Sequence, residues 1–242
     1  DYEIFRLLPR KWAIEILYGL LGANVIGFHT YRYTQYFLRC VLYLLGINND
    51  MNKIILENNV ARVDTFPMGI DFKKFNSAIR LKEVKKAIKY YSKKLSDVKV
   101  ILSVDRLDYT KGILNRLFAF EKFLTNYPQL HNKVVLLLVV VPSRTGVAHY
   151  DKIKRDIDQM VGKINGEFGN VNWTPIVYQY RFEPFNRLAA LYIISDIAMI
   201  TPLRDGMNLI AKEYVASHED KTGVLILSEM AGASSELGET II

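Results

Sequence analysis

The sequence is poor in the features that mark disulfide-rich secreted proteins and membrane proteins. It has one cysteine, Cys40, among 242 residues, so no disulfide can form within the chain. The longest strongly apolar stretch, residues 134–141, is too short to cross a bilayer as a helix. We therefore expect Cys40 to be a buried apolar residue on a helix and the protein to be cytoplasmic, where thiols stay reduced.

Other absences concern the start of the chain and its short motifs. No signal-peptide pattern opens the sequence, and its first residue is Asp1, so we expect a piece of a longer protein. The sequence contains neither a Walker loop nor a G-x-G-x-x-G fingerprint, and its four histidines lack the spacing of a metal site. A binding site therefore has to be sought in less familiar patterns.

What the sequence does have is a large apolar fraction and an uneven distribution of positive charge. Hydrophobic residues make up 50% of the chain, enough for a substantial core. The net charge of +7 arises in residues 73–99, which hold ten Lys or Arg against Glu83 and Asp97. Apolar residues recur there at helical spacing, which favours an amphipathic helix with a solvated lysine face. A patch for nucleic acid or lipid headgroups is the alternative, although we expect neither partner.

Apolar, strand-like runs alternate with helical patterns along most of the chain. The expected strands are 61–66, 99–104, 134–141, 175–180, 197–201 and 223–228. The expected helices are 79–95, 113–126, 150–165, 184–195 and 207–218, with a short last one at 230–237. This alternation predicts an α/β fold with a doubly wound, parallel, Rossmann-like sheet.

The pattern changes before residue 60, where two apolar helices flank the short strand 24–28. Too few strands lie there for a complete sheet. We interpret residues 1–66 as the C-terminal remnant of a second, preceding Rossmann-like domain and residues 67–242 as the main domain. Residues 67–71 then resemble a hinge between the two domains.

Charged residues and glycine follow two of the expected strands. Arg106 and Lys111 lie on one strand-to-helix loop, and Asp205 and Gly206 lie on another. Ligands bind at the carboxyl edge of open parallel sheets, and both loops should lie at that edge. Two nearby cations can straddle a diphosphate, and the helix start after Gly206 offers N–H groups to an anion.

Two less specific interpretations stay open for these loops. Asp205 and Gly206 could form a plain surface turn that satisfies backbone geometry alone. The charges of the first loop could instead pair among themselves in solvent; they belong to Asp105, Arg106, Asp108 and Lys111.

Long blocks of the sequence resemble trehalose-6-phosphate synthases. They include VDRLDYTKGI (104–113), TPLRDGMNLIAKEYVA (201–216) and GVLILSEMAGASSEL (223–237), and they occur in that family's order over nearly the whole chain. The resemblance implies a GT-B glycosyltransferase, in which two Rossmann-like domains face each other across a cleft. It further implies transfer of glucose from UDP-glucose to glucose 6-phosphate, with retention at the anomeric carbon, to give trehalose 6-phosphate. No metal and no other cofactor would be needed.

The resemblance also implies roles for individual residues of the 67–242 domain, which would bind the UDP-sugar. Arg106 and Lys111 match the cations that neutralise the departing diphosphate, and Asp205 matches the carboxylate that grips the donor glucose; these three are the candidate catalytic residues. The other candidate donor-binding residues of this segment are Gly206, Met207, Asn208, Leu209, Ile210 and Glu213. Of these, Glu213 matches the glutamate that accepts the ribose hydroxyls.

Further candidates lie outside these two loops. Arg144 matches the arginine that reaches the acceptor phosphate. Pro142, Arg181 and Phe182 are weaker candidates for a uracil pocket, because they end their strands. His29 resembles a cleft residue of the acceptor-side domain, and a structural histidine bonded to backbone is the alternative.

Parts of the family's first domain have no counterpart in the chain, so we expect it to hold nucleotide but to be inactive alone. The alternatives are a non-catalytic nucleotide-sugar-binding or regulatory module and a GT-B enzyme with a different acceptor. The expected partners are UDP-glucose and glucose 6-phosphate, with a trehalose-phosphatase domain or subunit and a second copy of the chain as further candidates. Affinity that falls with salt and ignores UDP would instead indicate a polyanion partner.

Overall fold

The structure is a computed structural model that describes residues 2–144, 146–220 and 222–240. The chain divides into two compact units, Asp1–Met68 and Gly69–Ile242. The division falls within the Pro67–Asp71 segment that the sequence marks as a hinge. Each unit has its own sheet and its own core.

The smaller unit is a three-stranded sheet packed against helices. β1 (Val25–Phe28) pairs in parallel with β3 (Val60–Thr65), and β2 (Lys53–Ile55) pairs antiparallel with β3. The helices are α1 (Tyr2–Phe5), α2 (Arg10–Leu21) and α3 (Tyr31–Leu45). Cys40 lies on α3 and is 5% exposed, which confirms its predicted burial on a helix. β2 was not predicted, because a three-residue strand carries too little periodicity to be recognised.

The larger unit is built on a five-stranded, wholly parallel sheet of order β6-β5-β4-β7-β8. The strands are β4 (Lys99–Arg106), β5 (Val134–Val141), β6 (Ile176–Tyr180), β7 (Ile197–Ile200) and β8 (Val224–Leu227). β5 consists of Val and Leu throughout and is buried along nearly its whole length, as a strand covered on both faces must be. The predicted doubly wound parallel sheet is therefore confirmed.

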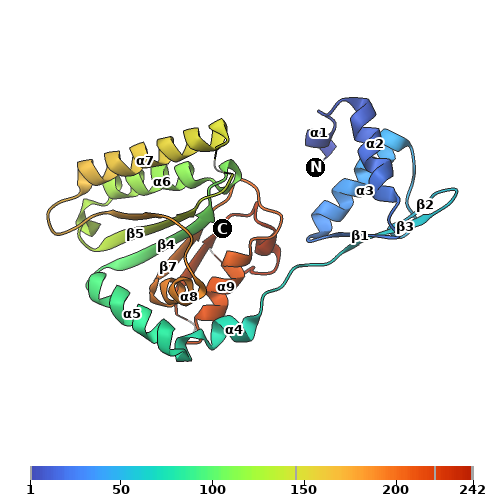
Figure 1. The fold of residues 1–242 in the computed structure, drawn as a ribbon. Helices are drawn as coiled ribbons and strands as arrows, with labels where there is room; N and C mark the ends of the chain where they lie inside the picture. The colour runs from blue at the N-terminus through green and yellow to red at the C-terminus, as the bar shows by residue number, and fades with distance from the viewer. Residues whose placement is uncertain (1, 145, 221, 241–242) are drawn as a thin grey trace. The chain divides into compact units, whose positions relative to one another are not determined.

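Helices cover both faces of this sheet (Figure 1). One face carries α6 (Ile113–Asn126) and α7 (Ala148–Phe168), whose core includes Leu117 and Ile157. The opposite face carries α4 (Phe72–Asn76), α5 (Lys82–Lys94), α8 (Phe185–Ile194) and α9 (Leu209–Ser217). Short 3-10 turns complete the unit at Ala78–Arg80, Tyr109–Lys111, Pro128–Leu130 and Gly232–Ser235.

Most expected elements occur within a few residues of their predicted bounds, with two differences near the C-terminus. The helix expected from Met207 begins at Leu209, because the Asn208 side chain accepts a hydrogen bond from the Ala211 N–H and caps it. The helix expected at 230–237 is a single 3-10 turn, Gly232–Ser235.

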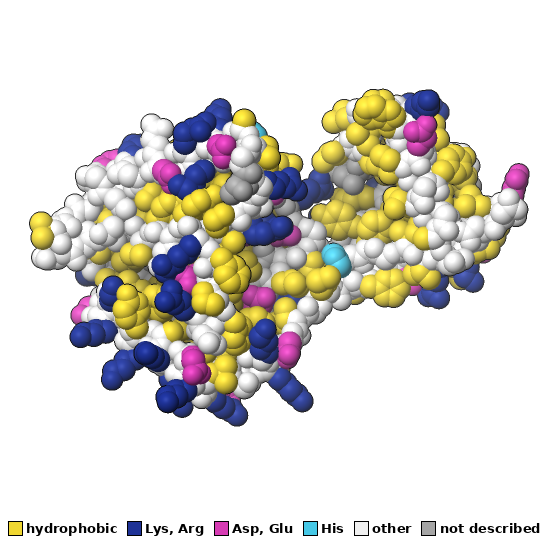
Figure 2. Space-filling view, in the orientation of Figure 1, with side chains coloured by type: hydrophobic (Ala, Val, Ile, Leu, Met, Phe, Trp, Pro, Cys, Tyr) yellow, Lys and Arg dark blue, Asp and Glu magenta, His cyan; other side chains and the backbone are white. Residues whose placement is uncertain are grey.

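The lysine-rich segment forms α5, whose Val84 and Tyr91 are buried while its lysines lie in solvent. In Figure 2, dark blue side chains gather at the lower left of the larger unit, where Figure 1 places α5. The arrangement is the amphipathic helix with a solvated face that the periodicity predicts. Among the described residues, the structure contains no helix with the length and apolar character needed to span a membrane.

Candidate functional site

Two charged loops meet at the carboxyl edge of the larger sheet. The chain runs from β4 outward through β5 and β6, then returns to the other side of β4 to form β7 and β8. The loops after β4 and β7 therefore diverge from neighbouring strands, and this is the switch point where open α/β sheets bind ligands. The backbone holds the loops together, because the Leu203 N–H donates to the Thr110 carbonyl over 2.8 Å.

Lys111 and Asp205 connect the two loops through their side chains. The Lys111 Nζ lies 2.5 Å from the Asp205 Oδ2, and the two side chains are only 12% and 13% exposed. The Asn208 Nδ2 donates to the same carboxylate oxygen over 2.9 Å. The Asp205 backbone is fixed as well, since its N–H donates to the Met230 carbonyl. The candidate phosphate-binding lysine is thus neutralised by the candidate sugar-binding carboxylate.

The alternative in which the charges of the first loop pair among themselves is wrong for the described residues. Asp105 pairs with Arg116, and Lys111 pairs with Asp205. Asp108 caps the 3-10 turn instead, accepting from the Thr110 N–H over 2.9 Å. The plain surface turn proposed for Asp205 is wrong too, because its carboxylate makes the ion pair just described.

Arg116 of α6 braces the first loop from beneath and was not predicted. It is 1% exposed. Its guanidinium donates to the Ser103 Oγ over 2.5 Å, to the Asp105 carboxylate, and to the carbonyls of Met199 and Lys111. Burial raises the pKa of Asp105, and the Arg116 charge opposes that rise. One signal was available, because Arg116 falls between Ile113, Leu117 and Phe120 on the apolar face of α6.

The arginine brace and the glycine beside it fix where Lys111 can lie. Gly112 has a left-handed φ of +65°, and a Cβ built on it would lie 2.8 Å from the Thr201 carbonyl oxygen. Replacing Gly112 by alanine should lower the free energy of unfolding by roughly 1–2 kcal/mol from the left-handed backbone alone. Urea denaturation measures this.

Gly162 provides a matched control for that substitution. It lies in α7 of the same unit with no atom near its would-be Cβ, so Gly162→Ala should raise stability, by roughly 0.5–1 kcal/mol. A Gly112→Ala variant as stable as the unsubstituted chain would contradict a cost from the left-handed backbone at this position.

The start of α9 carries the remaining candidate donor-binding residues. Gly206 and Met207 precede the helix, Asn208 is its N-cap, and Leu209 begins it. Met207 and Ile210 pack against the core of the larger unit. The first N–H groups of α9 therefore point toward the same edge of the sheet as Lys111, a place that favours anions.

Glu213 lies one turn further along α9 and is held by a residue that was not predicted. Its Oε2 accepts a hydrogen bond of 2.7 Å from the hydroxyl of Tyr192 on α8. Burial raises the pKa of the half-buried Glu213, and this hydrogen bond opposes the rise. An interior tyrosine within an apolar helix gave no sequence signal for such a partner.

Arg106 and Arg144 are the more exposed cations of this region. Arg106 makes no side-chain hydrogen bond or ion pair with the residues that the structure describes. Arg144 follows β5 with a left-handed φ of 49°, and its Nη1 donates to the Tyr150 hydroxyl over 2.6 Å. The Tyr150 hydroxyl lies 3.4 Å from the Asp108 Oδ2, so the loops after β4 and β5 are also connected.

The weaker candidates are less closely connected. Pro142 and Arg181 follow the adjacent parallel strands β5 and β6, and Phe182 is 72% exposed. Arg181 is held by Glu183, to which its Nε donates over 2.5 Å. His29 belongs to the smaller unit, where its Nδ1 lies 3.3 Å from the Phe66 carbonyl oxygen, a backbone contact like that of a structural histidine.

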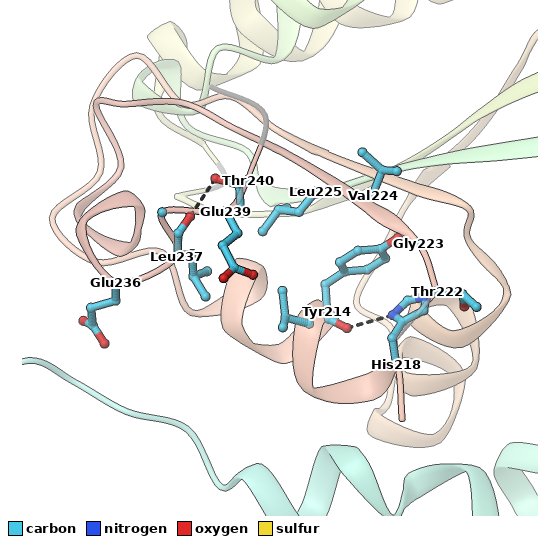
Figure 3. A pocket seen from close by; sticks show the side chains of 12 residues that line it. Tyr214, His218, Thr222, Gly223, Val224, Leu225, Glu236, Leu237, Glu239 and Thr240 are labelled. Carbon is cyan, nitrogen blue, oxygen red and sulfur yellow. Dashed lines mark hydrogen bonds between the residues drawn. The ribbon is translucent and has the colours of Figure 1, made fainter. Parts of the chain in front are cut away.

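A hollow of about 720 Å³ lies elsewhere in the larger unit (Figure 3). It is bounded by Tyr214 and His218 at the end of α9, by the start of β8 and by residues 236–240. This place is toward the amino edge of the sheet, whereas the charged loops lie at its carboxyl edge. The hollow is lined by none of the candidate catalytic residues. Within the described residues, no group of three or more His, Cys, Asp or Glu is placed to hold a metal ion.

A parallel sheet with cations and a capped helix start at its switch point is the architecture of a Rossmann-like nucleotide-binding domain. The family model described as glycosyltransferase family 20 matches residues 1–242, and the chain belongs to this family. Similarity to individual trehalose-6-phosphate synthases confirms the predicted resemblance.

The chain is similar to the bifunctional trehalose-6-phosphate synthase/phosphatase of Thermoproteus tenax, with 52% identity over 240 residues, which are 99% of this chain and 33% of that protein. A trehalose-6-phosphate protein from E. coli, solved with bound UDP-2-fluoro glucose, gives a TM-score of 0.92 at 34% identity. That match covers 99% of this chain and 53% of the other.

The alpha,alpha-trehalose-phosphate synthase (UDP-forming) of Burkholderia xenovorans, solved in complex with glucose-6-phosphate, gives a TM-score of 0.91 at 33% identity. It is matched over 95% of this chain and 51% of that chain. The chain thus spans between one third and about half of these proteins. The predicted fold class, α/β of the GT-B type, is confirmed by these similarities.

Proposed function

We propose that the protein is a retaining glycosyltransferase that transfers glucose from UDP-glucose to glucose 6-phosphate, giving trehalose 6-phosphate and UDP. The observation that carries the proposal is the meeting of Lys111 and Asp205 at the switch point of the sheet. The relatives support the substrates, since one was solved with a UDP-glucose analogue and another with glucose-6-phosphate.

In this proposal the diphosphate of the donor displaces an internal partner. Lys111 leaves Asp205 for the diphosphate, and Arg106 adds a second positive charge from the solvent side. Charge that grows on the departing UDP is then stabilised more strongly than charge in the ground state, which lowers the barrier. The freed Asp205 carboxylate accepts hydrogen bonds from hydroxyls of the donor glucose, while the Asn208 side chain keeps that carboxylate oriented. The positive charge comes from these side chains, and no metal is assigned.

The remaining candidates bind the ends of the substrates. Glu213 accepts the ribose hydroxyls, and the N–H groups around Leu209 contact the sugar and the diphosphate. Arg144 binds the acceptor phosphate, for which a guanidinium offers a fork of donors. Pro142, Arg181 and Phe182 border the uracil, and His29 is a lower-ranked candidate that belongs to the smaller unit.

The setting of the protein is proposed on slighter support. A cytoplasmic location agrees with the single, buried Cys40. A phosphatase domain or subunit is a proposed partner, because the Thermoproteus tenax relative is bifunctional. Association with a second copy of the chain is a further proposal.

Nucleotide binding tests the proposal on this chain directly. We expect UDP to bind at least about tenfold more tightly than UMP, because the second phosphate gains charge-assisted hydrogen bonds from Lys111 and Arg106. Isothermal titration with both nucleotides measures the preference. Equal affinities would contradict a diphosphate site.

The alternative functions differ in the reaction that the bound UDP-glucose undergoes. UDP release that depends on added glucose 6-phosphate would identify the transferase, and release with another sugar alone would identify a different acceptor. Because this chain is expected to be inactive alone, release is assayed with the full-length protein. Binding of UDP-glucose by that protein without release in the presence of any acceptor is the result that a binding or regulatory module predicts.

A further inference from the structure

Tyr192 is a fully buried tyrosine whose ring packs in the core and whose hydroxyl group needs a hydrogen-bond partner there. Its side chain is 0% exposed, and its ring contacts those of Phe75 and Tyr214 in the core between α8 and α9. A phenol hydroxyl in such a place needs a partner, because a buried unpaired hydroxyl costs free energy. The partner is the Glu213 Oε2, at 2.7 Å.

The hydrogen bond runs from the core to the edge of the site. Tyr192 is anchored on α8, whereas Glu213 lies on α9 and is only half-buried. The bond occupies one of the lone pairs of the carboxylate and leaves the others for ligand donors. It also holds a side chain that otherwise has three rotatable bonds.

We propose that Tyr192 is a positioning residue that fixes the Glu213 carboxylate for the two hydroxyls of the nucleotide ribose, and so sets the preference for ribose in the diphosphate ligand. The proposal rests on the proposed function, in which Glu213 reads the ribose. Two ribose hydroxyls require both carboxylate oxygens in one orientation, and a carboxylate free to rotate would give up part of that geometry.

The chain contains a matched control for this role. Tyr214 is also buried in the same core, and its ring contacts that of Tyr192. Its hydroxyl donates to the Ser195 carbonyl over 3.1 Å and has no bond to Glu213. Tyr214→Phe therefore removes a buried phenol hydroxyl without touching the carboxylate.

The test compares UDP with 2′,3′-dideoxyuridine diphosphate, which lacks both ribose hydroxyls. In the unsubstituted chain we expect UDP to bind more tightly than the dideoxy nucleotide. Tyr192→Phe should weaken UDP binding by roughly five- to tenfold, the scale of one lost hydrogen bond, and leave the dideoxy affinity unchanged. Tyr214→Phe should leave the ratio of the two affinities as it is.

A double variant separates positioning from a merely structural role. If Tyr192 acts through Glu213, adding Tyr192→Phe to a Glu213→Gln variant should not reduce its preference for UDP over the dideoxy nucleotide any further. If Tyr192→Phe leaves the ratio of the UDP affinity to the dideoxy affinity unchanged, the inference is overturned. An unsubstituted chain that binds UDP and the dideoxy nucleotide equally would overturn the ribose role of Glu213 and the inference with it. If Glu213→Gln alone abolishes the preference, the ribose role stands whatever Tyr192 does.

Discussion

Replacing Arg116 by methionine is expected to lower the free energy of unfolding by about 3–5 kcal/mol, because it leaves a buried carboxylate without its counter-charge. Arg116 and Asp105 are 1% and 2% exposed, so water cannot replace the lost guanidinium. The substitution also removes donors from Ser103 and from two backbone carbonyls. Chemical denaturation at pH 7 measures the change.

The pH dependence of this loss identifies its cause. Burial raises the pKa of Asp105 even with Arg116 in place, and without Arg116 the pKa should rise further. The folded variant then holds a proton that the unfolded chain releases near pH 4, so the variant loses stability as pH rises from there to the new folded pKa. The difference from the unsubstituted chain should therefore be smallest in acid.

An exposed ion pair provides the comparison for Arg116. Arg80 contacts Glu219 over 2.7 Å with both side chains largely in solvent. Arg80→Met should cost less than about 1 kcal/mol, with little dependence on pH. Similar losses in the two variants would mean that burial does not determine what the Arg116 brace contributes.

Replacing Lys111 by alanine is expected to weaken UDP binding by about 1.5–3 kcal/mol, for two reasons that act together. The diphosphate loses a cation, and Asp205 loses its partner and then repels the ligand. Arg106→Ala should have a smaller effect that fades with added salt, because Arg106 is exposed and its charge is screened. Calorimetric titration of UDP at two salt concentrations distinguishes the variants.

Asp205→Asn should change UDP affinity in the direction that is predicted only if the diphosphate displaces Asp205 from Lys111. Without the carboxylate charge, Lys111 is released, so UDP should bind more tightly than to the unsubstituted chain. UDP-glucose should lose the additional affinity that its sugar gives it over UDP, because the hydroxyls of the donor glucose lose the carboxylate that accepts their hydrogen bonds. Weaker UDP binding in Asp205→Asn would contradict the proposed displacement. Lys122→Ala, on the exposed side of α6, serves as a control that should change neither affinity.

The sheet and its helices could be predicted because their signals are local. Residues 134–141 are a continuous β-branched and leucine run, and β5 has those same bounds. The meeting of the two charged loops followed from topology, since parallel strands bring their carboxyl ends to one edge. The start of α9 was misplaced by two residues, because Asn208 was read as helical and not as the cap.

The sequence by itself determined the parallel α/β unit and the edge at which its polar loops lie, because periodicity and strand direction are encoded residue by residue. Only the tertiary structure decided which charges pair. Lys111 and Asp205 are 94 residues apart, and the sequence left open that the charges of the first loop pair among themselves. The roles of Arg116 and Tyr192 became visible only in the folded chain. A buried polar group is stable only where other elements supply its hydrogen-bond partners, and those partners come together only once the sheet and its helices have packed.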